Sequence, residues 1–112
     1  MPAEDDDATV SFPATATFAR LGRVTVSGLA IRLGLDIARV ERLRSAVDLA
    51  VDAMAGDGQV TIHARWHEDF IEITVSNPEV NAENTGGALT LQLTELVDQA
   101  LVAPSEITLV LQ

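Results

Sequence analysis

Apolar residues recur along this chain with two different periods, which divide it into helical and extended segments. Spacings of three and four predict helices over about residues 14–34, 37–55 and 89–100. Strict alternation of apolar and polar residues predicts strands over 60–66 and 71–75, joined by a hairpin connection at 67–69. Two further extended stretches, 8–12 and 107–111, are each set off by a proline. The pattern therefore predicts the element order β-α-α-β-β-α-β.

The second predicted helix is marked at both ends as well as along its length. Asp36 precedes it and supplies the side-chain acceptor that favours an N-cap, and the sequence Gly56-Asp57-Gly58 ends it. Its apolar positions form one stripe and its polar positions form the opposite one. The apolar stripe consists of Val40, Leu43, Val47, Ala50, Val51 and Met54, and the polar stripe of Glu41, Ser45, Asp48 and Asp52.

These elements fit one domain of two layers. A chain of 112 residues, of which 47% are hydrophobic, can bury one core. Helices on one face of a sheet would bury both amphipathic patterns, so we expect an α+β two-layer sandwich. The predicted sheet is mixed, with four to five strands, and about three helices cover one face. We expect residues 1–7 to be a disordered acidic tail and residues 8–112 to form the single domain.

Charge and hydropathy exclude some classes of function. The net charge of -10 argues against nucleic acid as a partner, because phosphate binding requires clustered cations. No apolar run approaches the roughly 18 residues of a membrane span. The acidic start is unlike the basic start of a secretory signal, so we expect a cytoplasmic protein.

The cations are distributed unevenly. All seven are arginines, and six of them lie between Arg20 and Arg44. From Trp66 to the end of the chain there are eight acidic residues and no Lys or Arg. This asymmetry fits either a solvated surface with a compositional bias or arginine-rich helices that contact an acidic partner or a second copy of the chain.

Candidate metal-ligating and ligand-binding residues are few. His63 and His67 lie on a predicted strand and its turn, where exposed hairpin positions explain them better than a metal site with three or four converging ligands. Asp48 and Asp52 share one helix face and could hold magnesium, but carboxylates on such an outward face are usually solvated. Trp66 is expected to anchor the edge of the core rather than to bind a ligand. We predict no metal site and no catalytic residue.

Fragments along most of the chain resemble the anti-sigma-factor serine kinases of the histidine-kinase-like ATPase superfamily, which has the Bergerat fold. The fragments are Arg32-Leu33-Gly34-Leu35-Asp36, Leu43-Arg44-Ser45-Ala46-Val47-Asp48, Ile71-Glu72-Ile73-Thr74-Val75, Gly87-Ala88-Leu89-Thr90-Leu91-Gln92-Leu93 and Leu96-Val97-Asp98. By this resemblance, residues 40–54 form the N-box helix of the family. Residues 71–75 form the strand before its adenine-binding loop, and residues 87–93 follow its nucleotide lid.

The chain departs from the family at the nucleotide-binding positions. The catalytic Glu and the magnesium-binding Asn of the N-box correspond to Leu49 and Ala53, which can neither move a proton nor offer an oxygen. The adenine-binding Asp and the Gly two residues later correspond to Asn77 and Glu79. Gly87 matches the first Gly of the motif after the lid, but the second is absent. The site is therefore degenerate, and we expect neither ATP nor magnesium as a cofactor.

The resemblance implies a non-catalytic regulatory protein that binds a sigma factor or an anti-sigma-factor antagonist. Homodimers are common in the family, which makes a second copy of the chain a further candidate partner. We expect the partner to contact arginines of the first two helices, because arginine pairs bidentately with carboxylates and is enriched at interfaces. These residues are Arg20, Arg23, Arg39 and Arg42.

Two alternatives remain. The first is an ATP-dependent serine/threonine protein kinase with a divergent nucleotide site that uses Asp48, Asp52 and Asn77. The second is a dimeric structural accessory of a conventional kinase.

Overall fold

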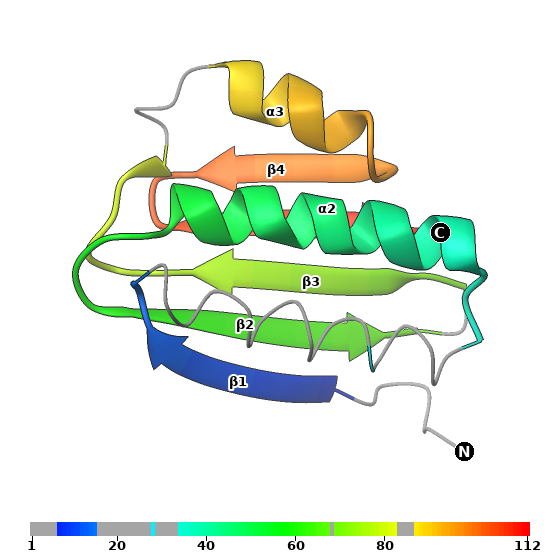
Figure 1. Ribbon diagram of the computed structural model, residues 1–112, viewed down its shortest axis with the longest axis horizontal. Helices are drawn as coiled ribbons and strands as arrows, with labels where there is room; N and C mark the ends of the chain where they lie inside the picture. The colour runs from blue at the N-terminus through cyan, green and yellow to red at the C-terminus, as the bar shows by residue number, and fades with distance from the viewer. Residues whose placement is uncertain (1–6, 16–27, 29–33, 68, 83–86) are drawn as a thin grey trace.

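The structure is a computed structural model that describes residues 7–15, 28, 34–67, 69–82 and 87–112. Five strands form one sheet in the order β1-β2-β3-β5-β4. The strands are β1 (Asp7–Pro13), β2 (Gln59–Trp66), β3 (Ile71–Ser76), β4 (Gln99–Ala103) and β5 (Glu106–Leu111). Helix α2 (Ile37–Ala53) lies over the middle of the sheet, and helix α3 (Gly87–Thr94) lies beside β4 (Figure 1). The predicted α+β two-layer class is confirmed.

Two predicted segments cannot be compared in full with the structure. Most of the predicted first helix, residues 16–27 and 29–33, lies outside the described residues. Residues 1–6 of the predicted acidic tail also lie outside them, and β1 starts at Asp7, one residue before the predicted strand.

All pairings between the described strands are antiparallel, whereas the sequence predicts a mixed sheet. Strands β3 and β4 run in the same direction across the connection that contains α3, but they are not neighbours. Strand β5 lies between them and pairs antiparallel with both. Two short hairpins, β2–β3 and β4–β5, thus account for the absence of a parallel pair, because short turns can join only antiparallel strands.

The core lies between the sheet and the helices. The predicted alternation of β2 is confirmed, since Val60, Ile62, Ala64 and Trp66 are buried, and the same holds for Ile71, Ile73 and Val75 of β3. All six predicted apolar residues of α2 and its flank are buried, together with Ala46. The N-cap prediction is also confirmed, because the Asp36 carboxylate accepts a hydrogen bond from the Arg39 backbone N–H at 2.8 Å. Neither α2 nor α3, the two helices in the described part of the chain, is long and apolar enough to cross a membrane.

The third helix is shorter than predicted. It ends at Thr94, and the N–H groups of Leu96 and Val97 close its last turn on the Leu93 carbonyl at 2.9 and 3.0 Å. The Asp98 N–H already bonds to the Val110 carbonyl at 2.9 Å, and residues 99–103 form β4. The helical prediction to about residue 100 was wrong because apolar residues at 96, 97, 100 and 102 fit both periods. The turn at 104–105 lets residues 99–103 pair with β5, and this pairing makes them a strand.

Candidate functional site at the end of helix α2

Asn77 follows β3 directly and is the one buried polar residue in the described part of the chain, with 0% exposure. Its side-chain nitrogen donates to the Met54 carbonyl at 2.9 Å and to the Asp57 carbonyl at 2.8 Å. Its side-chain oxygen accepts from the Glu79 backbone N–H at 3.0 Å. An Asn side chain has two N–H donors, and both are occupied. Asn77 therefore ties the loop after α2 to the end of β3.

The loop after α2 is fixed by backbone contacts as well. The Ala14 N–H donates to the Gly58 carbonyl at 3.0 Å, and the Gly56 N–H donates to the Ala14 carbonyl at 2.8 Å. Gly58 has a φ of 80°, and a Cβ atom there would lie 2.7 Å from Glu79 Cγ and 3.0 Å from the Asn77 side-chain oxygen. The close approach and the left-handed backbone both require glycine. The ends of β1, α2 and β3 thus form one connected unit.

The flank of α2 is apolar near this unit. Leu49 and Ala53 are half-buried and pack against the hydrophobic core. Glu79 is exposed at the start of the loop that follows β3. Gly87 begins α3 and is exposed, with no atoms within 4 Å of the position where a Cβ would lie. Leu49 and Ala53 can therefore provide packing, whereas neither side chain can transfer a proton or bind a metal ion.

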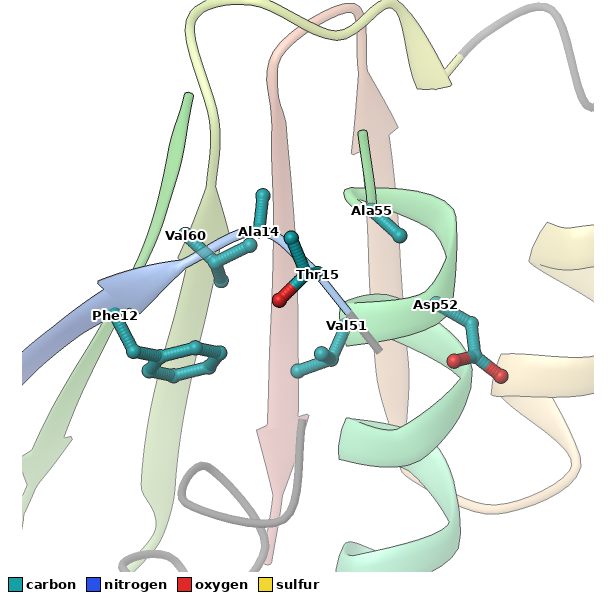
Figure 2. Close-up of a pocket in the computed structure, with 7 residues that line it drawn as sticks. All are labelled: Phe12, Ala14, Thr15, Val51, Asp52, Ala55 and Val60. Carbon is teal, nitrogen blue, oxygen red and sulfur yellow. The ribbon is translucent and has the colours of Figure 1, made fainter. Parts of the chain in front are cut away.

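A small pocket opens near the C-terminal end of α2 (Figure 2). Phe12, Val51 and Val60 line it together with Ala14, Thr15, Asp52 and Ala55. The Asp52 carboxylate points away from Phe12 and Val60 (Figure 2). The pocket encloses about 30 Å³, which is room for about one water molecule. Pockets that hold cofactors typically measure about 300–1,000 Å³, so this one is too small for a nucleotide.

The other candidate ligands do not converge. Asp52 is exposed and Asp48 is half-buried, and no group of three or more His, Cys, Asp or Glu that could hold a metal ion occurs among the described residues. His63 is half-buried on β2, and His67 stacks on Phe70 with ring centroids 4.3 Å apart.

Trp66 ends strand β2 and is 8% exposed, as predicted for an anchor at the edge of the core. Its indole nitrogen is buried and has no hydrogen-bond partner in the described structure.

Comparison with known proteins shows which proteins this chain is similar to. No protein-family model matches the chain. It is 34% identical over 79 residues to the serine-protein kinase RsbW of Listeria innocua serovar 6a and to that of Listeria monocytogenes serotype 4a. Each match covers 64% of this chain and 50% of the relative. The chain is homologous to RsbW.

The chain spans about half the length of the RsbW proteins that it matches. The solved structure of the RsbU and RsbW domains of Rv1364c from Mycobacterium tuberculosis has the same fold, with a TM-score of 0.77 at 18% identity. That match covers 96% of this chain and 32% of the other. The predicted resemblance to the anti-sigma-factor serine kinases is therefore confirmed, and the fold is that of the solved structure.

The structure brings three of the sequence-predicted positions, Ala53, Asn77 and Glu79, close together. Asn77 and Glu79 are joined by a hydrogen bond, and Asn77 bonds to the residue after Ala53. Sequence analysis gave Asn77 as a degenerate position of the adenine-binding motif and missed its bonds to Met54 and Asp57. The bond to the Glu79 N–H, two residues on, is the local kind that an Asn in a turn suggests, whereas the bonds to Met54 and Asp57 depend on the tertiary structure.

The predicted partner-binding arginines are placed in part. Arg39 and Arg42 are exposed on the first two turns of α2, whereas Arg20 and Arg23 lie outside the described residues. Arg44 forms an ion pair with Glu41 at 3.2 Å. Ile37, the first residue of α2, is 81% exposed beside these arginines. Sequence analysis missed Ile37, although its position outside the apolar stripe of the helix indicates exposure.

Proposed function

We propose that this chain is a non-catalytic, RsbW-like regulatory domain that acts by binding a sigma factor or an anti-sigma-factor antagonist. The observation that carries the proposal is the bonding of Asn77. In the kinase family this position would bind adenine, whereas here both amide hydrogens bond to backbone carbonyls of the loop after α2. An adenine amine would need an acceptor, and the Asn77 side-chain oxygen already accepts from the Glu79 backbone N–H in a residue that is 0% exposed.

The neighbouring positions support the absence of kinase activity. Leu49 and Ala53 pack against the core where the family has a catalytic Glu and a magnesium-binding Asn. Neither side chain can act as a general base or bind a hard cation. Glu79 adds a negative charge beside Asn77, which opposes the approach of phosphates. We therefore propose that ATP and magnesium are not cofactors.

Calorimetric titration with ATP and magnesium tests this part of the proposal. We expect no saturable binding with a Kd below about 1 mM, which corresponds to a binding free energy of about -4 kcal/mol. A matched titration of the Leu49→Glu and Ala53→Asn double variant reports whether the two replaced residues alone prevent binding. Micromolar binding by the unaltered chain would contradict the proposal.

The homology to serine-protein kinases supports the alternative, a kinase with a divergent site. Such an enzyme would have to use Asp48, Asp52 and Asn77. Transfer of radiolabelled phosphate from ATP to a candidate antagonist protein, lost in Asp52→Asn, would establish this alternative. No transfer by either form would favour the binding function.

The surface that we propose for the partner is the N-terminal end of α2, with Arg39, Arg42 and Ile37. A helix N-terminus carries a partial positive charge, which favours acidic residues in the first turn. Helix α2 has no acidic residue in its first turn and no basic residue in its last. Its arginines therefore add to the positive potential instead of offsetting it, at some cost in stability. Asp36 caps this end and Glu41 pairs with Arg44, so Arg39 and Arg42 are the cations that we propose pair with an acidic partner.

A capture experiment tests the proposed surface. The tagged chain and its Arg39→Glu/Arg42→Glu variant would be used to isolate partners from the native bacterial cytosol, with identification by mass spectrometry. Purified partner would then be titrated against both forms. We expect at least a tenfold loss of affinity, equivalent to about 1.4 kcal/mol.

Arg65→Glu is the matched control, because Arg65 is also exposed but lies on β2. An equal loss for one reversed charge on β2 would indicate a general effect of net charge, and the proposed surface would be wrong. Sedimentation velocity of the same proteins tests the proposed homodimer separately.

A further inference from the structure

Strand β4 forms one free edge of the sheet, and its composition differs from that of the other edge. Strand β1 contains a charged residue and a proline, Asp7 and Pro13. Such residues protect an edge strand against pairing with other chains. Strand β4 has the sequence QALVA and contains neither a charge nor a proline. Helix α3 lies beside β4, but the β4 sequence itself lacks the charge and the proline that would oppose pairing with another strand.

The side chains of β4 also leave one apolar contact exposed. Ala100 and Val102 are partly buried and pack against the core. Leu101 lies between them and points to the opposite face of the sheet, where it is 69% exposed. Its neighbour in register is Thr108 of β5. An added strand would cover Leu101 with a side chain of its own, because cross-strand neighbours lie about 4.5–5.5 Å apart.

The charges around β4 are all of one sign. Asp98 precedes the strand, and Glu106 lies opposite its last residue in the register with β5. Both are exposed, and among the described residues neither forms an ion pair. Strands β3, β4 and β5 contain no Lys or Arg, and Arg65 lies three strands away, at roughly 14 Å. Acidic groups thus flank both ends of the free edge.

We propose that the β4 edge binds an extended segment of a partner protein that is apolar at its centre and basic at its ends. Backbone hydrogen bonds to β4 would provide affinity, and the contacts with Leu101, Asp98 and Glu106 would provide selectivity. A second copy of the chain fits this edge less well. It would add a net charge of -10 and would place a second set of acidic groups beside the first. This surface is separate from the arginine surface of α2 and has the opposite charge.

Titration of the isotope-labelled chain with a capped peptide, Arg-Thr-Val-Thr-Val-Thr-Arg, tests the proposal by NMR. We expect the amide signals of residues 99–103 to shift and their hydrogen exchange to slow. A peptide with Glu in place of both Arg should bind at least tenfold more weakly.

The Leu101→Arg variant should reduce the affinity for the basic peptide about tenfold, whereas Leu91→Arg should leave it unchanged. Leu91 is the matched control because it is a similarly exposed leucine, at 67%, on α3.

Three results would overturn the proposal. One is the absence of shifts at residues 99–103 at peptide concentrations up to about 1 mM. Another is equal affinity for the basic and acidic peptides, or an equal effect of the two leucine variants. The third is self-association of the chain that Leu101→Arg abolishes, because the occupant of the edge would then be a second copy.

Discussion

Replacing Asn77 with Asp, the residue that the kinase resemblance places there, should strongly destabilise the fold. The substitution exchanges the donor that bonds to the Met54 and Asp57 carbonyls, at 2.9 and 2.8 Å, for an acceptor. One buried and one partly buried hydrogen bond are lost, and the two carbonyls then face a carboxylate. Because the site has 0% exposure, the charge has no solvent to stabilise it. An uncompensated buried charge costs about 3–5 kcal/mol, and we expect a loss in this range at neutral pH.

The effect should depend on pH with a defined sign. The buried site favours the neutral carboxyl, so the pKa of the new side chain should be higher in the folded than in the unfolded protein. The native state then retains a proton that the unfolded state has released. The free energy of unfolding of the variant should therefore decrease as pH rises from about 4, the ordinary pKa of Asp, to the raised folded value. Below that range, most of the electrostatic part of the loss should disappear.

Urea denaturation followed by tryptophan fluorescence provides the assay, because Trp66 is the single tryptophan of the chain and is buried. Asn77→Ala is the control. It removes the bonds to Met54 and Asp57, and also the bond accepted from the Glu79 N–H, without adding a charge, so it should cost about 2–4 kcal/mol and show no added dependence on pH. If Asn77→Asp were as stable as the unaltered chain at pH 7, the hydrogen-bond assignment of Asn77 would be wrong.

Three further substitutions test local features by the same denaturation assay. Asp36→Ala removes the N-cap of α2, whose carboxylate accepts from the Arg39 N–H at 2.8 Å, and should lower the free energy of unfolding by about 0.5–2 kcal/mol. Arg39→Glu should raise it by about 0.3–1 kcal/mol, because an acidic residue in the first turn offsets the helix dipole; a decrease would refute the charge argument for α2. Gly58→Ala should lower it by about 1–3 kcal/mol, since φ is 80° and the new Cβ would lie 2.7 Å from Glu79 Cγ; an unchanged midpoint would show that the loop adapts.

The sequence was sufficient to predict the elements in which the buried residues recur with a single period. The stripe on α2 is buried as predicted, and β2 and β3 alternate as predicted, because in each case one face contacts the core. The Asp36 cap was predictable because it depends on neighbours three residues away. Local patterns of this kind require no knowledge of the tertiary structure.

The remaining features depend on contacts between distant parts of the chain. Residues 96–102 fit a helix or a strand by period, and pairing with β5 selects the strand. The strand order, with β5 between β3 and β4, makes the sheet antiparallel and cannot be derived from periodicity. The role of Asn77 depends on carbonyls that lie 20 and 23 residues away. Sequence alone identified the position as altered but not what its side chain contacts.

Three of the positions that we propose to be degenerate, Leu49, Ala53 and Asn77, lie on α2 or contact the loop that follows it. Leu49 and Ala53 contribute apolar packing to the flank of α2, and Asn77 fixes the loop at the end of the same helix. Restoring an acidic residue at 49 would place a charge against apolar neighbours, and restoring Asp at 77 would break the buried bonds. Each single reversion towards a kinase therefore lowers stability without creating a complete nucleotide site. A fold with a free energy of unfolding of about 5–15 kcal/mol tolerates few such losses, so we expect single substitutions of this kind to destabilise the chain.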